Sequence, residues 1–190
     1  MTGSIERLKN EYAVGVRWRA FPLHPNTPEE GLSLEELFKN YPVNVDEIKS
    51  RSKKKAAELN LPFGDRTRTY NSRLSQEMGL WAESKGRGDQ FHMAAFRAYF
   101  VHGRNIAKIP VILGLTAEAG LPRDEAETVI SERAFRDRVD EDWAISRARG
   151  ITAVPTFMIE QDKLVGAQPY ETLERFLVEH GIGKAGGAGN

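Results

Sequence analysis

The segment GITAVPTFMI, residues 150–159, places a proline directly in front of an apolar strand, and this restricts the fold more than any other feature. Proline has no backbone N–H, so it is tolerated only on an edge strand, at the first residue of a strand or at a bulge. The tight connection QDK separates VPTFMIE from LVGA, which predicts a β-hairpin over 154–167. The following ETLERFLVEHG has helical periodicity, with Gly181 as its C-terminal stop. A hairpin followed by a helix is therefore expected here.

Pro155 has two interpretations on this pattern. The order strand, hairpin and helix is that of the C-terminal half of a thioredoxin fold, in which the X–Pro bond is cis. A cis bond there turns the preceding residue outward and leaves its backbone N–H and C=O available to an extended peptide or a thiol ligand. The other interpretation is a trans proline at the entrance of an ordinary strand. The residues of this segment leave both interpretations open.

The preceding residues combine one predicted strand with a long helical block. Residues 4–12 have the apolar spacing of a helix, and residues 14–21 alternate as in a strand. Further helices are predicted over 34–40, 44–60, 72–86, 88–102, 107–119, 123–132 and 134–149. Because an early strand and a late hairpin cannot form two good sheets, we expect one shared sheet with the helical block inserted.

The composition excludes several classes of function. The chain has no cysteine, which excludes a disulfide, a thiolate nucleophile and a cysteine-ligated metal. Lys+Arg and Asp+Glu are both 27, so the basic excess of a nucleic-acid or membrane-surface partner is missing. No apolar run approaches the ~18 residues of a membrane span. The four histidines lack the i, i+4 spacing of a helical metal site, so no metal is expected.

Several longer segments, in order along the chain, resemble one family. They are VRWRAFPLHPNTPEEG, LPFGDRTRTYNSRLSQEMGLWAESKG, DQFHMAAFRAYFVHGRNI, ARGITAVPTFMI and VGAQPYETLERFL. Through them nearly the whole chain resembles the DsbA-like thioredoxin-fold family, in particular its cytoplasmic dithiol–disulfide isomerase branch. The resemblance implies a cis Val154–Pro155 bond, a cytoplasmic location and a protein or small thiol or disulfide as substrate.

The sequence departs from this family at its N-terminus. Family members have a strand and then a Cys-x-x-Cys motif at the start of the first helix, where the helix dipole lowers the thiol pKa. GSIERLKNEY resembles the helix body after those cysteines, so we expect the strand and the cysteines to lie upstream of Met1. Without them the strands at 14–21 and 156–160 are expected to have unpaired edges, which a longer natural protein, closure of the strands or a homodimer would relieve.

The resemblance predicts the fold class and the domains together. We expect an α/β protein with a thioredoxin-like fold, incomplete at its N-terminus, and a large inserted all-helical domain. The predicted thioredoxin-like domain consists of 1–30 and 145–183, and the helical insertion of 31–144. The glycine-rich tail 184–190 is expected to be disordered.

The candidate site residues are substrate-binding, and the resemblance assigns no catalytic residue. Val154 and Pro155 are expected to present the docking backbone, with Thr156 beside them. The other candidates follow the early strand, lie on the connection 60–72, follow the aromatic helix or open the last helix: His24, Arg66, Tyr70, Asn71, Asn105 and Gln168. For His24 the alternative is an ordinary surface residue, and for Arg66, Tyr70, Asn71 and Asn105 it is a structural capping network.

Three functions remain open. The first is a DsbA-type thiol–disulfide oxidoreductase scaffold, redox-inactive as this chain because it has no thiolate. The second is a glutathione-dependent isomerase or transferase that resembles the 2-hydroxychromene-2-carboxylate isomerases, which use glutathione as their thiol. The third is a non-catalytic peptide-binding module. No cofactor is expected under the first function, whereas glutathione is possible under the second.

Overall fold

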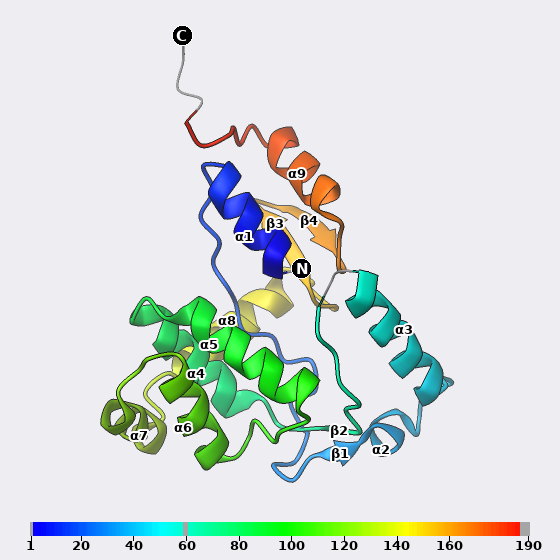
Figure 1. Ribbon diagram of the computed structural model, residues 1–190, viewed down its shortest axis with the longest axis vertical. Helices are drawn as coiled ribbons and strands as arrows, with labels where there is room; N and C mark the ends of the chain where they lie inside the picture. Colours follow the sequence, from blue (N-terminus) through cyan, green and yellow to red (C-terminus); the bar gives the residue numbers. More distant parts are fainter. Residues whose placement is uncertain (1, 59–60, 187–190) are drawn as a thin grey trace. The chain divides into compact units, whose positions relative to one another are not determined.

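A computed structural model describes residues 2–58 and 61–186, and Figure 1 shows them coloured along the chain. By their contacts they form two compact units. The first consists of the described residues of Met1–Leu23 and Ala144–Asn190, and the second spans His24–Trp143. The sequence placed residues 24–30 with the first unit, but their contacts place them in the second.

The elements follow in chain order. The helices are α1 (Thr2–Glu11), α2 (Leu34–Phe38), α3 (Val45–Glu58), α4 (Arg73–Ser84), α5 (Gly88–Phe96), α6 (Ile109–Glu118), α7 (Arg123–Glu132), α8 (Arg136–Ala148) and α9 (Tyr170–Glu179), with a π-helical turn η1 (Arg97–Val101) after α5. The strands are β1 (Leu32–Ser33), β2 (Arg68–Thr69), β3 (Thr156–Ile159) and β4 (Asp162–Val165).

Local sequence signals set several of these boundaries. At α2 the Glu36 N–H donates to the Ser33 hydroxyl at 3.0 Å, and the Ser33 N–H donates to the Glu36 carboxylate at 2.6 Å, which together form a capping box. Gly181 ends α9 with a φ of 73°, a left-handed conformation that glycine adopts without strain. The Ile182 N–H then donates to the Leu177 C=O and closes the last turn.

The first unit packs α1 and α9 beside the β3–β4 hairpin (Figure 1). The Tyr12 hydroxyl donates to Glu174 at 2.7 Å, and the Tyr170 hydroxyl donates to Glu11 at 2.6 Å. The bond to Glu11 raises the pKa of Tyr170 to about 12. Between the helices lies one apolar cluster, whose buried members are Leu8, Tyr12, Leu173 and Leu177.

The strand predicted over 14–21 does not form, and the expectation of one shared sheet is wrong. The described residues contain two separate two-stranded antiparallel sheets, β1–β2 and β3–β4. An alternating sequence becomes a strand only when a neighbour completes its hydrogen-bond ladder. Here the Val14 N–H donates to the Tyr12 C=O within its own segment, and no strand of the described residues pairs with residues 14–21.

The tail predicted to be disordered is ordered at its start. Lys184 forms an isolated antiparallel bridge with Tyr12, and the Ala185 N–H donates to the Glu11 C=O at 2.9 Å. The prediction is therefore wrong for Lys184 and Ala185, because the end of α1 supplies backbone partners for them. Residues 187–190 lie outside the described residues.

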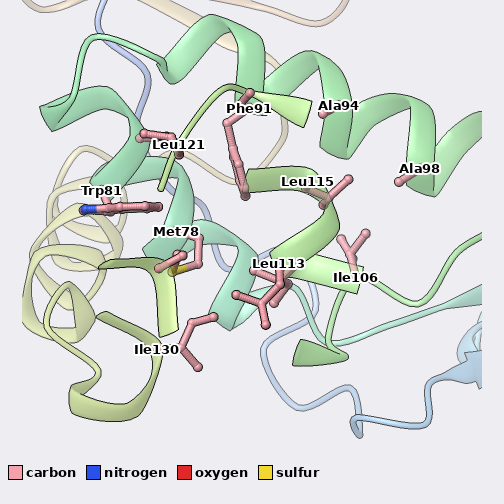
Figure 2. Close-up of a cluster of buried hydrophobic side chains, with 14 residues drawn as sticks. Met78, Trp81, Phe91, Ala94, Ala98, Ile106, Leu113, Leu115, Leu121 and Ile130 are labelled. Atoms are coloured by element: carbon pink, nitrogen blue, oxygen red, sulfur yellow. The ribbon is translucent and has the colours of Figure 1, made fainter. Parts of the chain in front are cut away.

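The second unit is built around the apolar contacts of α4, α5, α6 and α7. Figure 2 shows the cluster, in which Phe91, Ala94 and Ala98 are almost completely buried. The segment 88–102 therefore lies at the centre of this core. The expected single helix is interrupted, however, because its second half winds into the π-helical turn η1. Such turns are rare and change the direction of the following side chains.

Candidate functional site

The segment that contains Pro155 forms a loop in the first unit, here called the Val154 loop (residues 150–155). The Val154–Pro155 bond is cis, as expected from the sequence. The Gly166 N–H donates to the Pro155 C=O at 2.8 Å, and the Thr156 hydroxyl donates to the Ala153 C=O at 2.7 Å. These two bonds hold the loop against the hairpin.

Val154 presents both its backbone and its side chain at the surface. Val154 is one of the few large apolar residues that are exposed, with 44% of its surface accessible. No hydrogen bond joins its N–H or C=O to another described residue. An extended ligand can therefore bind here by main-chain hydrogen bonds, as a peptide does at a free strand.

The free backbone continues along one edge of β3. In an antiparallel pair, alternate residues direct their N–H and C=O toward the partner strand. Because the Pro155 C=O bonds to Gly166 across the hairpin, Phe157 and Ile159 also face β4. The backbone groups of Thr156 and Met158 consequently face the opposite edge, where no strand of the described residues lies.

Gln168 lies beside this loop, but its side chain binds the backbone. Its Nε2 donates to the Val165 C=O at 2.6 Å, just before α9 begins. Val165 is itself 53% exposed and pairs with Thr156 across the hairpin. The sequence reasoning missed Val165, which places a second exposed apolar side chain near the loop; the β4 alternation was the signal that could have found it.

Asn71 and Asn105 have the structural role that the sequence left as an alternative. The Asn71 Nδ2 donates to the Thr27 C=O at 2.7 Å, and its Oδ1 accepts the Arg73 N–H at 2.9 Å. The Asn105 Nδ2 donates to the Glu29 C=O and its Oδ1 accepts a backbone N–H, both at 2.9 Å. The two amides therefore fasten the loop 24–31 to the helical unit, which explains why that loop belongs to it.

Arg66 and Tyr70 lie in an aromatic cluster of the second unit. Arg66 Nη1 donates to the Arg68 C=O at 3.0 Å and to the Tyr99 hydroxyl, and its guanidinium lies 4.5 Å from the Tyr99 ring centre. The Tyr70 hydroxyl donates to the Gly103 C=O at 3.4 Å. Tyr99 was not among the sequence candidates, because its place on an aromatic helix predicted a core residue and nothing indicated the turn η1.

His24 belongs to the same electrostatic environment. Partial burial lowers its pKa from the usual value near 6.5, and the positive charge of Arg66 lowers it further. Its C=O accepts bonds from both the backbone N–H and the hydroxyl of Thr27. The second unit thus brings together His24, Arg66 and Tyr70, while Val154, Pro155, Thr156 and Gln168 are brought together in the first.

The described residues restrict the chemistry further. Within 2–58 and 61–186, no three histidine or carboxylate side chains are placed to hold a metal ion. No helix in those ranges has the length and apolar character needed to cross a bilayer. With no cysteine in the chain, the unpaired backbone at Val154 is not accompanied by a thiol nucleophile.

The structure is similar to solved structures of thioredoxin-fold proteins. A probable DsbA oxidoreductase from Streptomyces coelicolor is 22% identical with a TM-score of 0.75, over 83% of this chain and 71% of that one. A 2-hydroxychromene-2-carboxylate isomerase is 17% identical with a TM-score of 0.71, over 95% of this chain and 86% of that one. The cytosolic disulfide reductase DsbM from Pseudomonas aeruginosa, solved with GSH, is 27% identical with a TM-score of 0.52, over 72% and 79%.

The family comparison covers almost the whole chain. No curated protein matches the chain significantly. The model of the DSBA-like thioredoxin domain, by contrast, matches residues 1–178. This match confirms both the resemblance seen in the sequence and the thioredoxin-like fold class. The chain therefore belongs to the DSBA-like thioredoxin domain family.

Proposed function

We propose that this chain is the scaffold of a DsbA-type thiol–disulfide oxidoreductase, which binds a protein or small thiol or disulfide but performs no exchange alone. The observation that carries this is the free backbone of Val154 in a chain without cysteine. Exchange requires a thiolate to attack one sulfur of a disulfide and expel the other as a thiol. This polypeptide can supply the binding surface for that reaction but not the attacking sulfur.

Glutathione is the small thiol that we propose for the Val154 loop. The relative DsbM, solved with GSH, supports this choice, and its cytosolic origin supports a cytoplasmic location. Glutathione is a tripeptide, so its main chain can pair with one free N–H and C=O as an added strand does. No other cofactor is proposed, and the balanced charge supports the absence of a nucleic-acid or membrane partner.

The test compares two substitutions at one position. Val154→Pro removes the backbone N–H, whereas Val154→Ala keeps it and removes the exposed side chain. If the ligand binds the backbone, the proline variant loses one hydrogen bond of about 1 kcal/mol, a roughly fivefold higher Kd for glutathione. The alanine variant should stay within about twofold of the parent.

The readout is an NMR titration of labelled protein with reduced glutathione. Unchanged far-UV circular dichroism of both variants is the control for folding. Equal losses in both variants would assign binding to the side chain, and no saturable shift in the parent chain would refute the proposed site.

A glutathione-dependent isomerase or transferase is the second candidate. The structural similarity to the 2-hydroxychromene-2-carboxylate isomerase extends over most of both chains. A chain without cysteine also fits an enzyme whose thiol comes from glutathione. Isomerisation of 2-hydroxychromene-2-carboxylate that depends on added glutathione would favour this candidate. Glutathione or peptide binding without either activity would leave the non-catalytic module.

A homodimer is proposed at the free edge of β3. The strand TFMI has no charged residue, while β4 contains Asp162 and Lys163, which discourage pairing at its outer edge. Two copies of β3 can pair because nothing charged opposes them. Sedimentation should show a dimer that Met158→Pro dissociates, since only an N–H on the free edge is lost; a monomeric parent chain would refute this.

A further inference from the structure

The second unit contains a cavity of about 510 Å³ between α3 and the connection that follows it. Helix α3 contributes the side chains of Asp46, Lys49, Ser50 and Lys53, and the connection contributes Phe63, Gly64, Asp65, Arg66 and Thr67, so three cationic and two acidic residues line the cavity. A volume of this size is typical of small-molecule sites. The Val154 loop contributes no residue to it, so this cavity is separate from the binding backbone proposed above.

Arg66 lies at this cavity with unused hydrogen-bonding capacity. Only its Nη1 has hydrogen-bond partners, the Arg68 C=O and the Tyr99 hydroxyl. Its Nε is buried and has no partner among the described residues, so this atom does not itself face the cavity. Its Nη2 has no hydrogen-bond partner among the described residues and is the group left to bind a ligand.

Two lysines of α3 add positive charge to the cavity. The Lys49 ammonium lies 3.6 Å from Glu35 and 3.9 Å from Asp46, distances too long for hydrogen bonds. Lys53 forms an ion pair with Asp65, whose side chain is 85% exposed. A ligand anion can therefore hydrogen-bond to Lys49 directly and can take the place of the exposed Asp65 at Lys53.

The other wall, formed by the connection, carries the apolar ring of Phe63 and is held in place. The ring of Phe63 packs at 5.9 Å from that of Phe100 in η1. The Gly64 N–H donates to the Phe100 C=O at 2.9 Å, and a Cβ at Gly64 would clash with the Val101 C=O. The connection is thus fixed against η1, which positions Arg66 before any ligand arrives and reduces the entropic cost of binding.

We propose that this cavity binds a small organic anion. Its phosphate or carboxylate group accepts hydrogen bonds from Arg66, Lys49 and Lys53, and its apolar part lies against Phe63. Arginine suits this role because its guanidinium is always charged and forms strong, charge-assisted hydrogen bonds with both acid groups. The hydroxyl of Ser50, which also lines the cavity, supplies a further donor.

The test uses phenyl phosphate and benzoate as probes, which share an aromatic ring and differ in the acid group. Lys53→Gln and Arg66→Gln should each raise the Kd about fivefold to tenfold in calorimetry on the full chain. Lys54→Gln is the matched control, because it removes the same charge from α3 at an exposed position outside the cavity. It should change the Kd by less than about twofold.

Each outcome decides the proposal. Cavity-specific losses for either probe support it, and the tighter probe identifies the acid group. Equal losses in Lys53→Gln and Lys54→Gln would show general charge attraction and overturn the proposal, as would the absence of saturable binding for both probes. If Arg66→Gln unfolds, the exposed pair Lys53→Gln and Lys54→Gln still decides.

Discussion

Glu77→Ala should destabilise the second unit more than any exposed charge substitution. The Glu77 side chain is only 2% exposed and accepts three hydrogen bonds. One comes from Arg73 Nε at 2.9 Å, and two come from Arg133, from Nε at 2.8 Å and from Nη2 at 2.6 Å. Removing one partner of a buried ion pair costs about 3–5 kcal/mol, because the remaining charge is left without compensation.

The surroundings place this substitution at the lower end of that range. Arg73 keeps a hydrogen bond to Asp140 at 2.7 Å and another to the Arg136 C=O at 2.8 Å. Arg133 is 46% exposed, so water can solvate its guanidinium after Glu77 is gone. We therefore expect a loss of about 3 kcal/mol in the free energy of unfolding.

Urea unfolding followed by tryptophan fluorescence measures this loss. With a slope of about 2–3 kcal/mol per molar, the midpoint should fall by roughly 1–1.5 M at unchanged slope. Glu118→Ala is the control, because Glu118 pairs with Arg97 at the surface, where such a pair contributes under about 1 kcal/mol. A Glu77→Ala midpoint no lower than that of Glu118→Ala would refute the reasoning.

Four further substitutions test other parts of the fold. Hydrogen bonds to the Phe176 C=O and to Asp162 raise the pKa of His180, so its stabilisation is complete below the unfolded pKa near 6.5 and is lost as the pH rises through the folded pKa. The melting temperature should therefore fall less between pH 5.5 and 8.5 in His180→Gln than in the parent chain. Gly64→Ala should lower the free energy of unfolding by about 1–3 kcal/mol, because its new Cβ clashes with η1. Gly114→Ala, at a helical position with open space around it, should raise the free energy of unfolding by about 0.5–1 kcal/mol. Urea midpoints measure both changes. Asn71→Ala should cost about 1–2 kcal/mol and accelerate amide exchange in the loop 24–31, and unchanged exchange there would contradict its anchoring role.

The helices and the hairpin were predictable because their signals are local. The capping box at Ser33, the apolar period through Phe91 and the stop at Gly181 each depend on residues within one or two turns. The failed strand at 14–21 depended on a neighbour instead. Its alternating residues favour a strand, but this pattern does not show whether a partner strand lies beside them.

The candidate sites were predictable to different degrees. Pro155 marked the Val154 loop directly, because a proline in front of a strand has few structural explanations. The anchoring partners of Asn71 and Asn105 are distant in sequence, so only the structure shows that they bind Thr27 and Glu29.

The lysine run KSRSKKK shows the same limit at the cavity. A charged run of this kind is typical of a solvated helix face, and Lys54 is indeed exposed. Lys49 and Lys53, one helical turn apart, instead line the cavity beside Arg66. Lysines of the same helix therefore have different environments. The difference arises from the connection that folds beside α3, which the sequence of the helix does not reveal.

Insulin reduction by this chain, with its mass verified, tests the central claim most directly. The chain has no thiol that could form a mixed disulfide, so the rate of insulin precipitation with dithiothreitol should equal that of the buffer control. A rate clearly above the control, abolished by removing the protein, would contradict the claim that this scaffold binds substrate without exchanging disulfides.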